Sequence, residues 1–138
     1  ILRLHHFSAK GWKGVPADGF VYDLTDYESI EDLYIITDIL ITDYSSVMFD
    51  YSILNRPMLF FAYDLEDYKE NLRGFYFDFV NDIPGPISRD TDQLIKDIKE
   101  YNEDSWKEKY KNYHDKFNGI DDGHASQEVI DVIKKVSR

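Results

Sequence analysis

The sequence of 138 residues predicts an α/β domain: a Rossmann-like parallel sheet with helices on both faces and a helical C-terminal tail. Short apolar runs in the first half are continuous rather than alternating, which is typical of strands buried on both faces of a parallel sheet. Helical patterns separate these runs, as in α/β proteins. After the breaker Pro84-Gly85-Pro86 the chain reads as a series of amphipathic helices.

Short-range patterns define the expected elements. Apolar runs predict strands at residues 1–4, 19–24, 39–42 and 58–62. Apolar residues at helical spacing, together with capping residues, predict helices at residues 29–37, 46–54, 92–101, 105–117 and 124–136. Because no internal repeat or low-complexity segment interrupts this order, we expect a single nucleotide-binding domain, residues 1–138, that ends in a helical layer.

Composition limits the possible functions. A formal net charge of -11 argues against a general nucleic-acid binder, since contact with the phosphate backbone needs clustered lysine and arginine. Any anionic ligand must then be bound locally, by backbone N–H groups, hydroxyls and a few cations. The sequence has no cysteine, which excludes disulfides, thiolate chemistry and cysteine-based metal sites. No apolar run reaches the roughly 18 residues of a membrane span, so we expect this chain to be soluble by itself.

The segment ITDYSSVMFD places two serines where a strand ends and a helix is expected to begin. Residues 39–42 read as the strand, Asp43 and Tyr44 turn the chain, and Ser45 and Ser46 are good N-cap residues. Ligands of open α/β sheets bind at the carboxyl ends of the strands. The N–H groups of the first helical turn and the two hydroxyls are therefore candidates to hold a phosphate or pyrophosphate.

A simpler interpretation of the serine pair is that one hydroxyl caps the helix and the other faces water, because serine caps are common. Position alone leaves both interpretations open. Asp50 lies one turn further along the helix, on the side of Ser46, where a carboxylate suits sugar hydroxyls better than phosphate. The combination indicates a ribose beside a pyrophosphate, as in a nucleoside diphosphate ligand.

The segment ILRLHHF places polar residues at the end of the first expected strand. Arg3 lies within an apolar run, and a charge in a buried strand usually has a partner or a ligand. His5 can act as acid, base or phosphate donor because histidine ordinarily titrates near neutrality, and a surface or core role is the alternative. We interpret His6 as structural. Arg73, in the segment NLRGFYF, is a further candidate for phosphate contact or else a member of a surface ion pair.

With these residues in place, the chain resembles a known family. The segment TDYSSVMFDYSILNRPMLFFAYDLEDYKENLRGFYFDF, followed by PGPI and preceded by ILRLHHF, is similar to the C-terminal nucleotide-binding domain of the CDP-glycerol glycerophosphotransferases, the teichoic acid polymerases of Gram-positive bacteria. The similarity extends from residue 1 to about residue 87, and the DDGHAS segment with its helix fits more loosely.

The resemblance implies the second domain of a GT-B-like enzyme of two Rossmann-like domains. Such enzymes transfer glycerol phosphate from CDP-glycerol to a lipid-linked poly(glycerol phosphate) at the cytoplasmic face of the cell membrane, and release CMP. The Arg-x-His of the family corresponds to Arg3 and His5, and His5 would be the catalytic residue. The residues implied to contact CDP-glycerol are Arg3, Leu4, His5, Asp43, Tyr44, Ser45, Ser46, Val47 and Asp50.

The resemblance also implies missing parts. A second essential histidine, the acceptor site and the membrane-associating segments belong to an N-terminal domain that this sequence lacks. Because the sequence begins within an expected strand and without an initiator methionine, we expect a fragment of a larger two-domain transferase. Its expected partners are that N-terminal domain, the donor and the lipid-linked acceptor, with no cofactor, no metal ion and no nucleic acid.

Two other interpretations remain open. A nucleotide-sugar glycosyltransferase or epimerase could use the same pyrophosphate site at a helix start. A non-catalytic acidic interaction domain could instead use the 16% aromatic residues as a partner surface, although a core and a cleft lining explain them more simply. Greater thermal stabilisation by CDP-glycerol than by UDP-sugars would argue against the first alternative. The absence of stabilisation by any nucleotide would favour the second.

Overall fold

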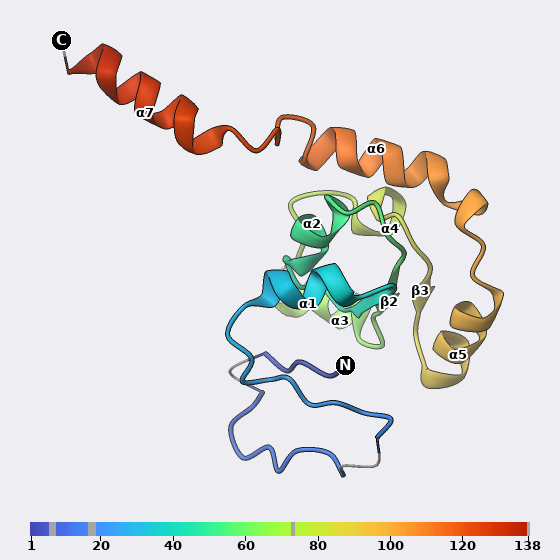
Figure 1. Ribbon diagram of the computed structural model, residues 1–138. Coiled ribbons are helices and arrows are strands. Elements are labelled where there is room, and N and C mark those ends of the chain that lie inside the picture. The colour runs from blue at the N-terminus through green and yellow to red at the C-terminus, as the bar shows by residue number, and fades with distance from the viewer. Residues whose placement is uncertain (6–7, 17–18, 73, 138) are drawn as a thin grey trace. The chain divides into compact units, whose positions relative to one another are not determined.

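The computed structural model describes residues 1–5, 8–16, 19–72 and 74–137. The chain divides into two compact units, Ile1–Ile36 and Thr37–Arg138, and each is described by itself (Figure 1).

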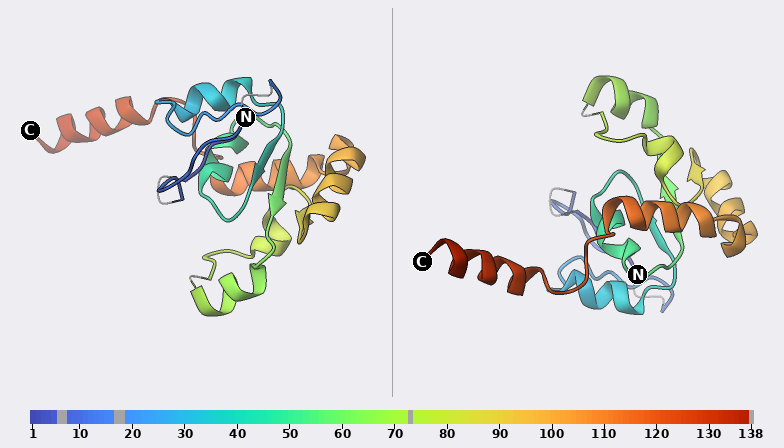
Figure 2. Two further views of the ribbon diagram at one scale, coloured as in Figure 1. Left: turned by 90° about the horizontal axis from the view of Figure 1, so that it is seen from below. Right: turned by 90° about the horizontal axis from the view of Figure 1, so that it is seen from above.

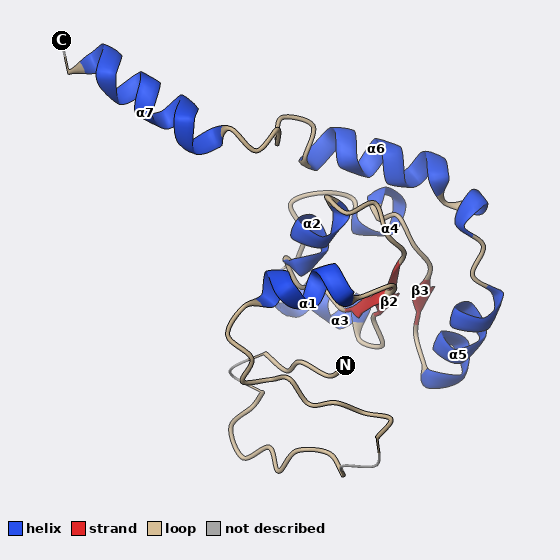
Figure 3. Cartoon of the chain, in the orientation of Figure 1, coloured by secondary structure: helices blue, strands red, loops and turns tan. Residues whose placement is uncertain are grey.

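The larger unit is built on a parallel sheet of three strands in the order β1-β2-β3 (Figure 3). The strands are β1 (Leu40–Thr42), β2 (Met58–Phe61) and β3 (Ile87–Ser88). The central strand β2 is buried: Met58, Leu59 and Phe60 are fully enclosed, as expected for the middle of a parallel sheet. The predictions for residues 39–42 and 58–62 are therefore confirmed.

Helices and short turns connect and cover these strands. They are α2 (Val47–Ser52), α3 (Leu65–Asp67), a π-helical turn (Tyr68–Leu72), α4 (Phe79–Asp82), α5 (Thr91–Glu100), a 3-10 turn (Glu103–Ser105), α6 (Lys107–Phe117) and α7 (Ala125–Val136). Helix α2 packs on β1, and α5 packs on β2 and β3. Figures 1 and 2 show α2 and α5 on opposite sides of the sheet, and α6 covers α2 and α4.

Aromatic side chains form the core between the sheet and α6. Phe49 of α2 stacks on Tyr113 of α6 with ring centroids 5.9 Å apart, and Phe60 of β2 meets Phe79 of α4 edge to face at 5.7 Å. Tyr113 and Phe79 are almost completely buried. The core thus explains part of the aromatic richness of the sequence, while other aromatic side chains, such as Phe20 and Tyr76, are exposed.

Helix α7 has the amphipathic pattern that the sequence predicts, but none of its residues is buried. Its apolar side chains, all exposed, are Val129, Ile130, Val132, Ile133 and Val136. No helix among the described residues has the length and apolar character needed to cross a membrane.

The smaller unit contains α1 (Ile30–Ile36), as predicted, but not the two expected strands. Residues 1–4 and 19–24 form only an isolated parallel bridge between Leu2 and Asp23. The ladder stops there because the next N–H group, that of Leu4, donates to the side-chain oxygen of Thr25 (3.2 Å) instead of to a backbone carbonyl. The prediction of full strands in this unit is therefore wrong.

Strand β3 was not predicted, since Pro84-Gly85-Pro86 reads as a breaker. In the structure this segment enters β3 and lies against β2: the N–H of Phe60 donates to the carbonyl oxygen of Pro86 at 2.9 Å. Gly85 permits the approach, because a Cβ atom at this position would lie 2.0 Å from the carbonyl oxygen of Met58. The segment that reads as a breaker in the sequence is therefore the place where the backbones of β2 and the residues before β3 come into close contact.

Candidate functional site

The loop after β1 is shaped by its own side chains. The Asp43 carboxylate accepts the N–H of Ser45 at 3.0 Å, which turns the chain as Asx motifs do. The Ser45 hydroxyl accepts the N–H of Val47 at 3.5 Å, a long and therefore weak hydrogen bond. Asp43 thus sets the shape of the loop, and the Ser45 hydroxyl makes only a weak hydrogen bond within it.

Ser46 occupies the N-cap position of α2 without acting as a cap. Its side chain accepts no hydrogen bond from the helix, and its backbone has helical angles (φ -61°, ψ -12°) that do not aim the hydroxyl at the first turn. Its side chain is exposed. Capping therefore does not explain Ser46. Helix α2 has only six residues, so the hydroxyls and loop N–H groups are stronger candidates for holding an anion than the helix dipole.

Asp50 lies in α2 four residues after Ser46, and its carboxylate is exposed. Residues four apart lie on the same side of a helix, so the Ser46 hydroxyl and the Asp50 carboxylate flank one stretch of surface. A hydroxyl donor and a carboxylate acceptor at this spacing suit a ligand with both an anionic and a hydroxylated part.

Tyr44 fixes this loop to the segment after β2. Its hydroxyl donates to the Asp64 carboxylate at 2.7 Å, its ring stacks on Tyr68 with centroids 4.0 Å apart, and Phe79 meets it edge to face at 5.6 Å. Burial, followed by the hydrogen bond to Asp64, raises the pKa of Tyr44 above its ordinary value. Tyr44 therefore stays protonated and anchors the loop rather than titrating.

A cation lies at the same edge of the sheet. Arg89 directly follows β3, and its guanidinium pairs with Glu66 of α3 at 3.3 Å, with both side chains well exposed. Because the three strands are parallel, the segments after them meet at one edge. This brings Arg89, Asp64 and the loop of residues 43–46, called the serine loop below, to the same side of the sheet. The charge of Arg89 also acts on the Tyr44 hydroxyl.

Sequence reasoning missed Asp64 and Arg89. For Asp64 a usable signal existed, because it is the first acidic residue after an expected strand. For Arg89 there was none, since the strand before it has two residues and follows a proline-rich segment. Arg73, proposed from sequence as a possible phosphate contact, lies outside the described residues, as does His6.

In the smaller unit, Arg3 is held by backbone carbonyls. Its guanidinium donates to the carbonyl oxygen of Tyr27 at 2.6 Å and to that of Leu24 at 3.4 Å. The charged side chain within the apolar run is therefore hydrogen-bonded by the chain itself, and it connects residues 1–4 to residues 24–27. His5 is exposed at the end of this braced segment, and its carbonyl oxygen accepts from the N–H groups of Ser8 and Ala9.

Leu4 is half-buried beside His5 and contributes its N–H to Thr25. A neighbouring carboxylate, Asp23, accepts hydrogen bonds from the Thr25 N–H (3.0 Å) and the Trp12 indole (2.6 Å). A hydrogen bond from the Thr25 side chain, followed by those from the Trp12 indole and the Thr25 N–H, lowers the pKa of Asp23 below its usual value.

The structure thus brings Arg3, Leu4 and His5 together in one unit, and Asp43, Tyr44, Ser45, Ser46, Val47 and Asp50 together in the other. Among the residues the structure describes, no group of three or more histidine, aspartate or glutamate side chains is arranged to hold a metal ion.

Known proteins are similar to this chain in sequence and in fold. The profile of the family CDP-Glycerol:Poly(glycerophosphate) glycerophosphotransferase matches residues 1–135. The teichoic acid poly(glycerol phosphate) polymerase of Bacillus subtilis (strain 168) is 43% identical over 137 residues, which are 98% of this chain and 18% of that protein. The teichoic acid glycerol-phosphate transferase of Staphylococcus aureus (strain NCTC 8325 / PS 47) is 47% identical over 120 residues, which are 86% of this chain and 31% of that protein.

A solved structure of a variant of the wall teichoic acid polymerase TagF, soaked with CDPG, superimposes with a TM-score of 0.82 at 41% identity. The match covers 96% of this chain and 34% of that one. The chain thus spans about a third or less of the proteins it matches. Since the family profile covers nearly every residue, this chain belongs to the CDP-Glycerol:Poly(glycerophosphate) glycerophosphotransferase family.

Proposed function

We propose that this chain is the donor-binding domain of a two-domain, GT-B-like glycerophosphotransferase of wall teichoic acid synthesis. The full enzyme moves glycerol phosphate from CDP-glycerol to a lipid-linked poly(glycerol phosphate) at the cytoplasmic face of the membrane. The observation that carries the proposal is the exposed Ser46 hydroxyl, which caps no helix and lies one turn from the Asp50 carboxylate in a member of this family. The soaking of CDPG into TagF supports CDP-glycerol as the donor.

The reaction is a phosphoryl transfer. A terminal hydroxyl oxygen of the acceptor attacks the phosphorus that carries glycerol, the bond from that phosphorus to the oxygen of CMP breaks, and CMP leaves with the bonding electrons. Such catalysis consists mainly of aligning the attacking and leaving oxygens and neutralising the charge on the leaving group. The protein's contribution is therefore placement of the pyrophosphate.

In this proposal the carboxyl edge of the sheet holds the donor. The Ser45 and Ser46 hydroxyls donate to pyrophosphate oxygens, and so does the N–H of Val47, which the Ser45 hydroxyl holds only weakly at 3.5 Å. Arg89 supplies positive charge at this edge of a strongly acidic chain. Asp50 accepts hydrogen bonds from the ribose hydroxyls. Asp43 and Tyr44 hold the loop in shape through Ser45 and Asp64.

The smaller unit supplies His5, which we assign to support of the departing CMP phosphate. Arg3 and Leu4 act by positioning His5. The Arg3 guanidinium is bound to the carbonyl oxygens of Tyr27 and Leu24. The Leu4 N–H is bound to the Thr25 hydroxyl, so the backbone that leads into His5 is fixed. The base that takes the proton of the acceptor hydroxyl belongs to the N-terminal domain of the same enzyme in this proposal.

Calorimetry and steady-state kinetics on the full-length enzyme test this assignment. The double variant Ser45→Ala/Ser46→Ala should bind CDP-glycerol at least about tenfold more weakly, as expected for lost hydrogen bonds to a charged group. The matched control Ser105→Ala, an exposed serine of the 3-10 turn, should bind normally. His5→Ala should instead lower kcat by about 100-fold, on the scale of a group that stabilises transition-state charge.

Unchanged donor affinity in the double variant would return the serines to a structural role, and near-normal turnover of His5→Ala would remove it from the catalytic centre. Thermal shifts with other donors address the substrate class. Greater stabilisation by UDP-sugars would favour a glycosyltransferase or epimerase, and greater stabilisation by CDP-ribitol would favour ribitol phosphate transfer.

A further inference from the structure

A cavity of about 390 Å³ opens at the amino end of β2, beside Asn55 and Pro57. The serine loop follows the carboxyl end of β1, which is parallel to β2, so the cavity and the serine loop lie at opposite edges of the sheet. One wall is a single face of α6, because Lys107, Tyr110, Lys111 and His114 recur at the three- and four-residue spacing of a helix face. The volume is within the roughly 300–1,000 Å³ typical of small-molecule sites.

Two buried tyrosine hydroxyls line this cavity. Tyr110 is 9% exposed, and its hydroxyl and that of Tyr101 interact with each other, but without the alignment of a full hydrogen bond. Burial is the main cause that raises the pKa of both, so both stay protonated. Each hydroxyl therefore keeps capacity for a further hydrogen bond, which a ligand in the cavity can use.

The charged residues of the cavity include one free cation. Lys111 pairs with Asp115 at 3.6 Å, whereas Lys107 has no ion pair among the residues that the structure describes. Glu103 lines the cavity one helical turn before Lys107 and can accept from a hydroxyl. Helix α6 also concentrates positive charge, with four lysines against Glu108 and Asp115, in a chain of net charge -11.

This donor and acceptor set has the chemistry of a phosphorylated polyol. Lys107 suits a phosphate, the Tyr101 and Tyr110 hydroxyls can donate to oxygen acceptors, and the Asn55 amide and the Glu103 carboxylate suit glycerol hydroxyls. A simple anion would leave Glu103 unfavourably placed, and a simple polyol would leave Lys107 unused. A ligand that alternates phosphate and hydroxylated carbons uses both.

We propose that this cavity binds a glycerol phosphate unit of the acceptor polymer, at a site separate from the donor edge. The inference rests on the proposed function for the identity of the polymer, and on the cavity for the location. The terminal hydroxyl that reacts is bound at the acceptor site that the resemblance assigns to the N-terminal domain, and this cavity holds another unit of the same polymer.

The test measures binding of a chemically defined glycerol phosphate trimer to the full-length enzyme by calorimetry. Lys107→Ala should weaken binding of the trimer about tenfold, the loss expected for one charge-assisted hydrogen bond, and Tyr110→Phe should weaken it several-fold without changing the shape of the cavity. The matched control is Lys109→Ala, since Lys109 lies over the Trp106 ring (5.3 Å from its centroid) and does not line the cavity.

Affinity for CDP-glycerol is measured on the same variants and should stay unchanged, which separates this inference from the proposed function. Trimer affinity that is unaffected by Lys107→Ala and Tyr110→Phe, or that is equally reduced by Lys109→Ala, would overturn the site. So would the absence of trimer binding in an enzyme that still binds CDP-glycerol. Failure of CDP-glycerol binding in the wild-type enzyme would instead contradict the proposed function.

Discussion

The two edges of the parallel sheet in Thr37–Arg138 are held together in different ways. At the carboxyl edge, exposed loops are joined by side chains, as in the hydrogen bond from Tyr44 to Asp64 (2.7 Å) and the ion pair of Arg89 with Glu66 (3.3 Å). At the amino edge, the backbone at Gly85 lies directly on that of Met58. We infer that substitutions at the first edge mainly change ligand binding, whereas substitutions at the second change the stability of the fold.

Gly85→Ala is expected to have the largest effect on stability. The added methyl group would lie 2.0 Å from the carbonyl oxygen of Met58 and 3.3 Å from the ring of Phe60, so β3 must move away from β2. The cost should be about 3 kcal/mol, at the upper end of the usual range for overpacking of a core, because the obstacle is backbone. Urea unfolding at neutral pH measures it as a lower midpoint.

Gly123→Ala is the matched control, because a Cβ atom there meets no other atom within 4 Å. Its positive φ of 81° should still cost about 1 kcal/mol, the usual penalty of a side chain in the left-handed region. Equal effects of the two substitutions would show that the contact between Gly85 and Met58 is not what closes the amino edge.

The same contrast explains what could be predicted from sequence. The strands at residues 39–42 and 58–62 and the serine loop were predictable, because continuous apolar runs and a strand-to-helix junction are local signals. The cavity beside α6 was not, since it joins Asn55, Tyr101 and Tyr110, residues that only the tertiary fold brings together. Strand β3 was missed because the breaker Pro84-Gly85-Pro86 hides a backbone contact.

Tyr44→Phe should separate stability from binding at the carboxyl edge. The variant keeps the ring on Tyr68 and loses only the hydrogen bond to Asp64, so the free energy of unfolding should fall by about 1 kcal/mol. The freed loop should bind CDP-glycerol several-fold more weakly, because the Ser45 and Ser46 hydroxyls are no longer held in place. Urea unfolding and calorimetry on the full-length enzyme measure the two effects.

Tyr63→Phe is a suitable control at this edge, since its side chain is 70% exposed just after β2. It should change neither quantity. Destabilisation by Tyr44→Phe as large as that by Gly85→Ala would contradict the proposed difference between the two edges, and so would a stability loss without any change in donor affinity.

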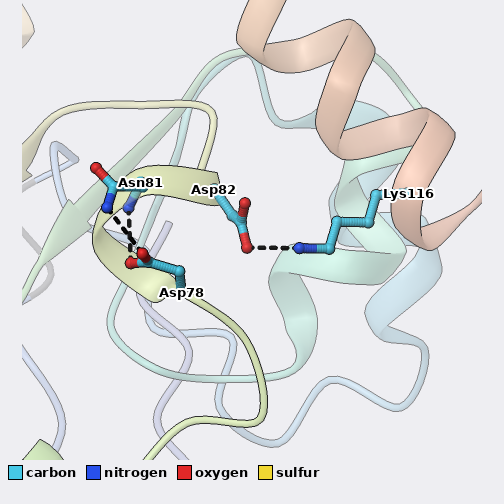
Figure 4. A network of polar contacts seen from close by, with 4 residues as sticks. All are labelled: Asp78, Asn81, Asp82 and Lys116. Atoms are coloured by element: carbon cyan, nitrogen blue, oxygen red, sulfur yellow. Dashed lines mark hydrogen bonds and ion pairs between the residues drawn. The ribbon is translucent and has the colours of Figure 1, made fainter.

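The smallest effect is expected at α4, which carries the chain from the carboxyl-edge loops to Gly85 at the amino edge. Asp78 caps this helix: its carboxylate accepts from the Asn81 side chain at 2.8 Å and from the Asn81 N–H at 3.2 Å (Figure 4). These hydrogen bonds, the side-chain one first, lower the pKa of Asp78 below its ordinary value. Lys116 donates instead to Asp82, at 2.6 Å, and ties α6 to α4.

A carboxyl group whose pKa is lower in the folded protein stabilises the fold above its unfolded pKa, about 3.9 for aspartate, and this contribution is lost as the pH falls through the folded value. Asn81→Ala removes the side-chain hydrogen bond that is the largest cause of the lowered pKa. An NMR titration should then show the pKa of Asp78 rising toward the ordinary aspartate value. Acidification below about pH 4 should also cost this variant less stability than it costs the wild type. Lys116→Ala should move this pKa less, because Lys116 is the weakest of its causes. A larger shift in Lys116→Ala than in Asn81→Ala would mean that charge rather than capping governs α4, and that the connection between the two edges is electrostatic instead of local.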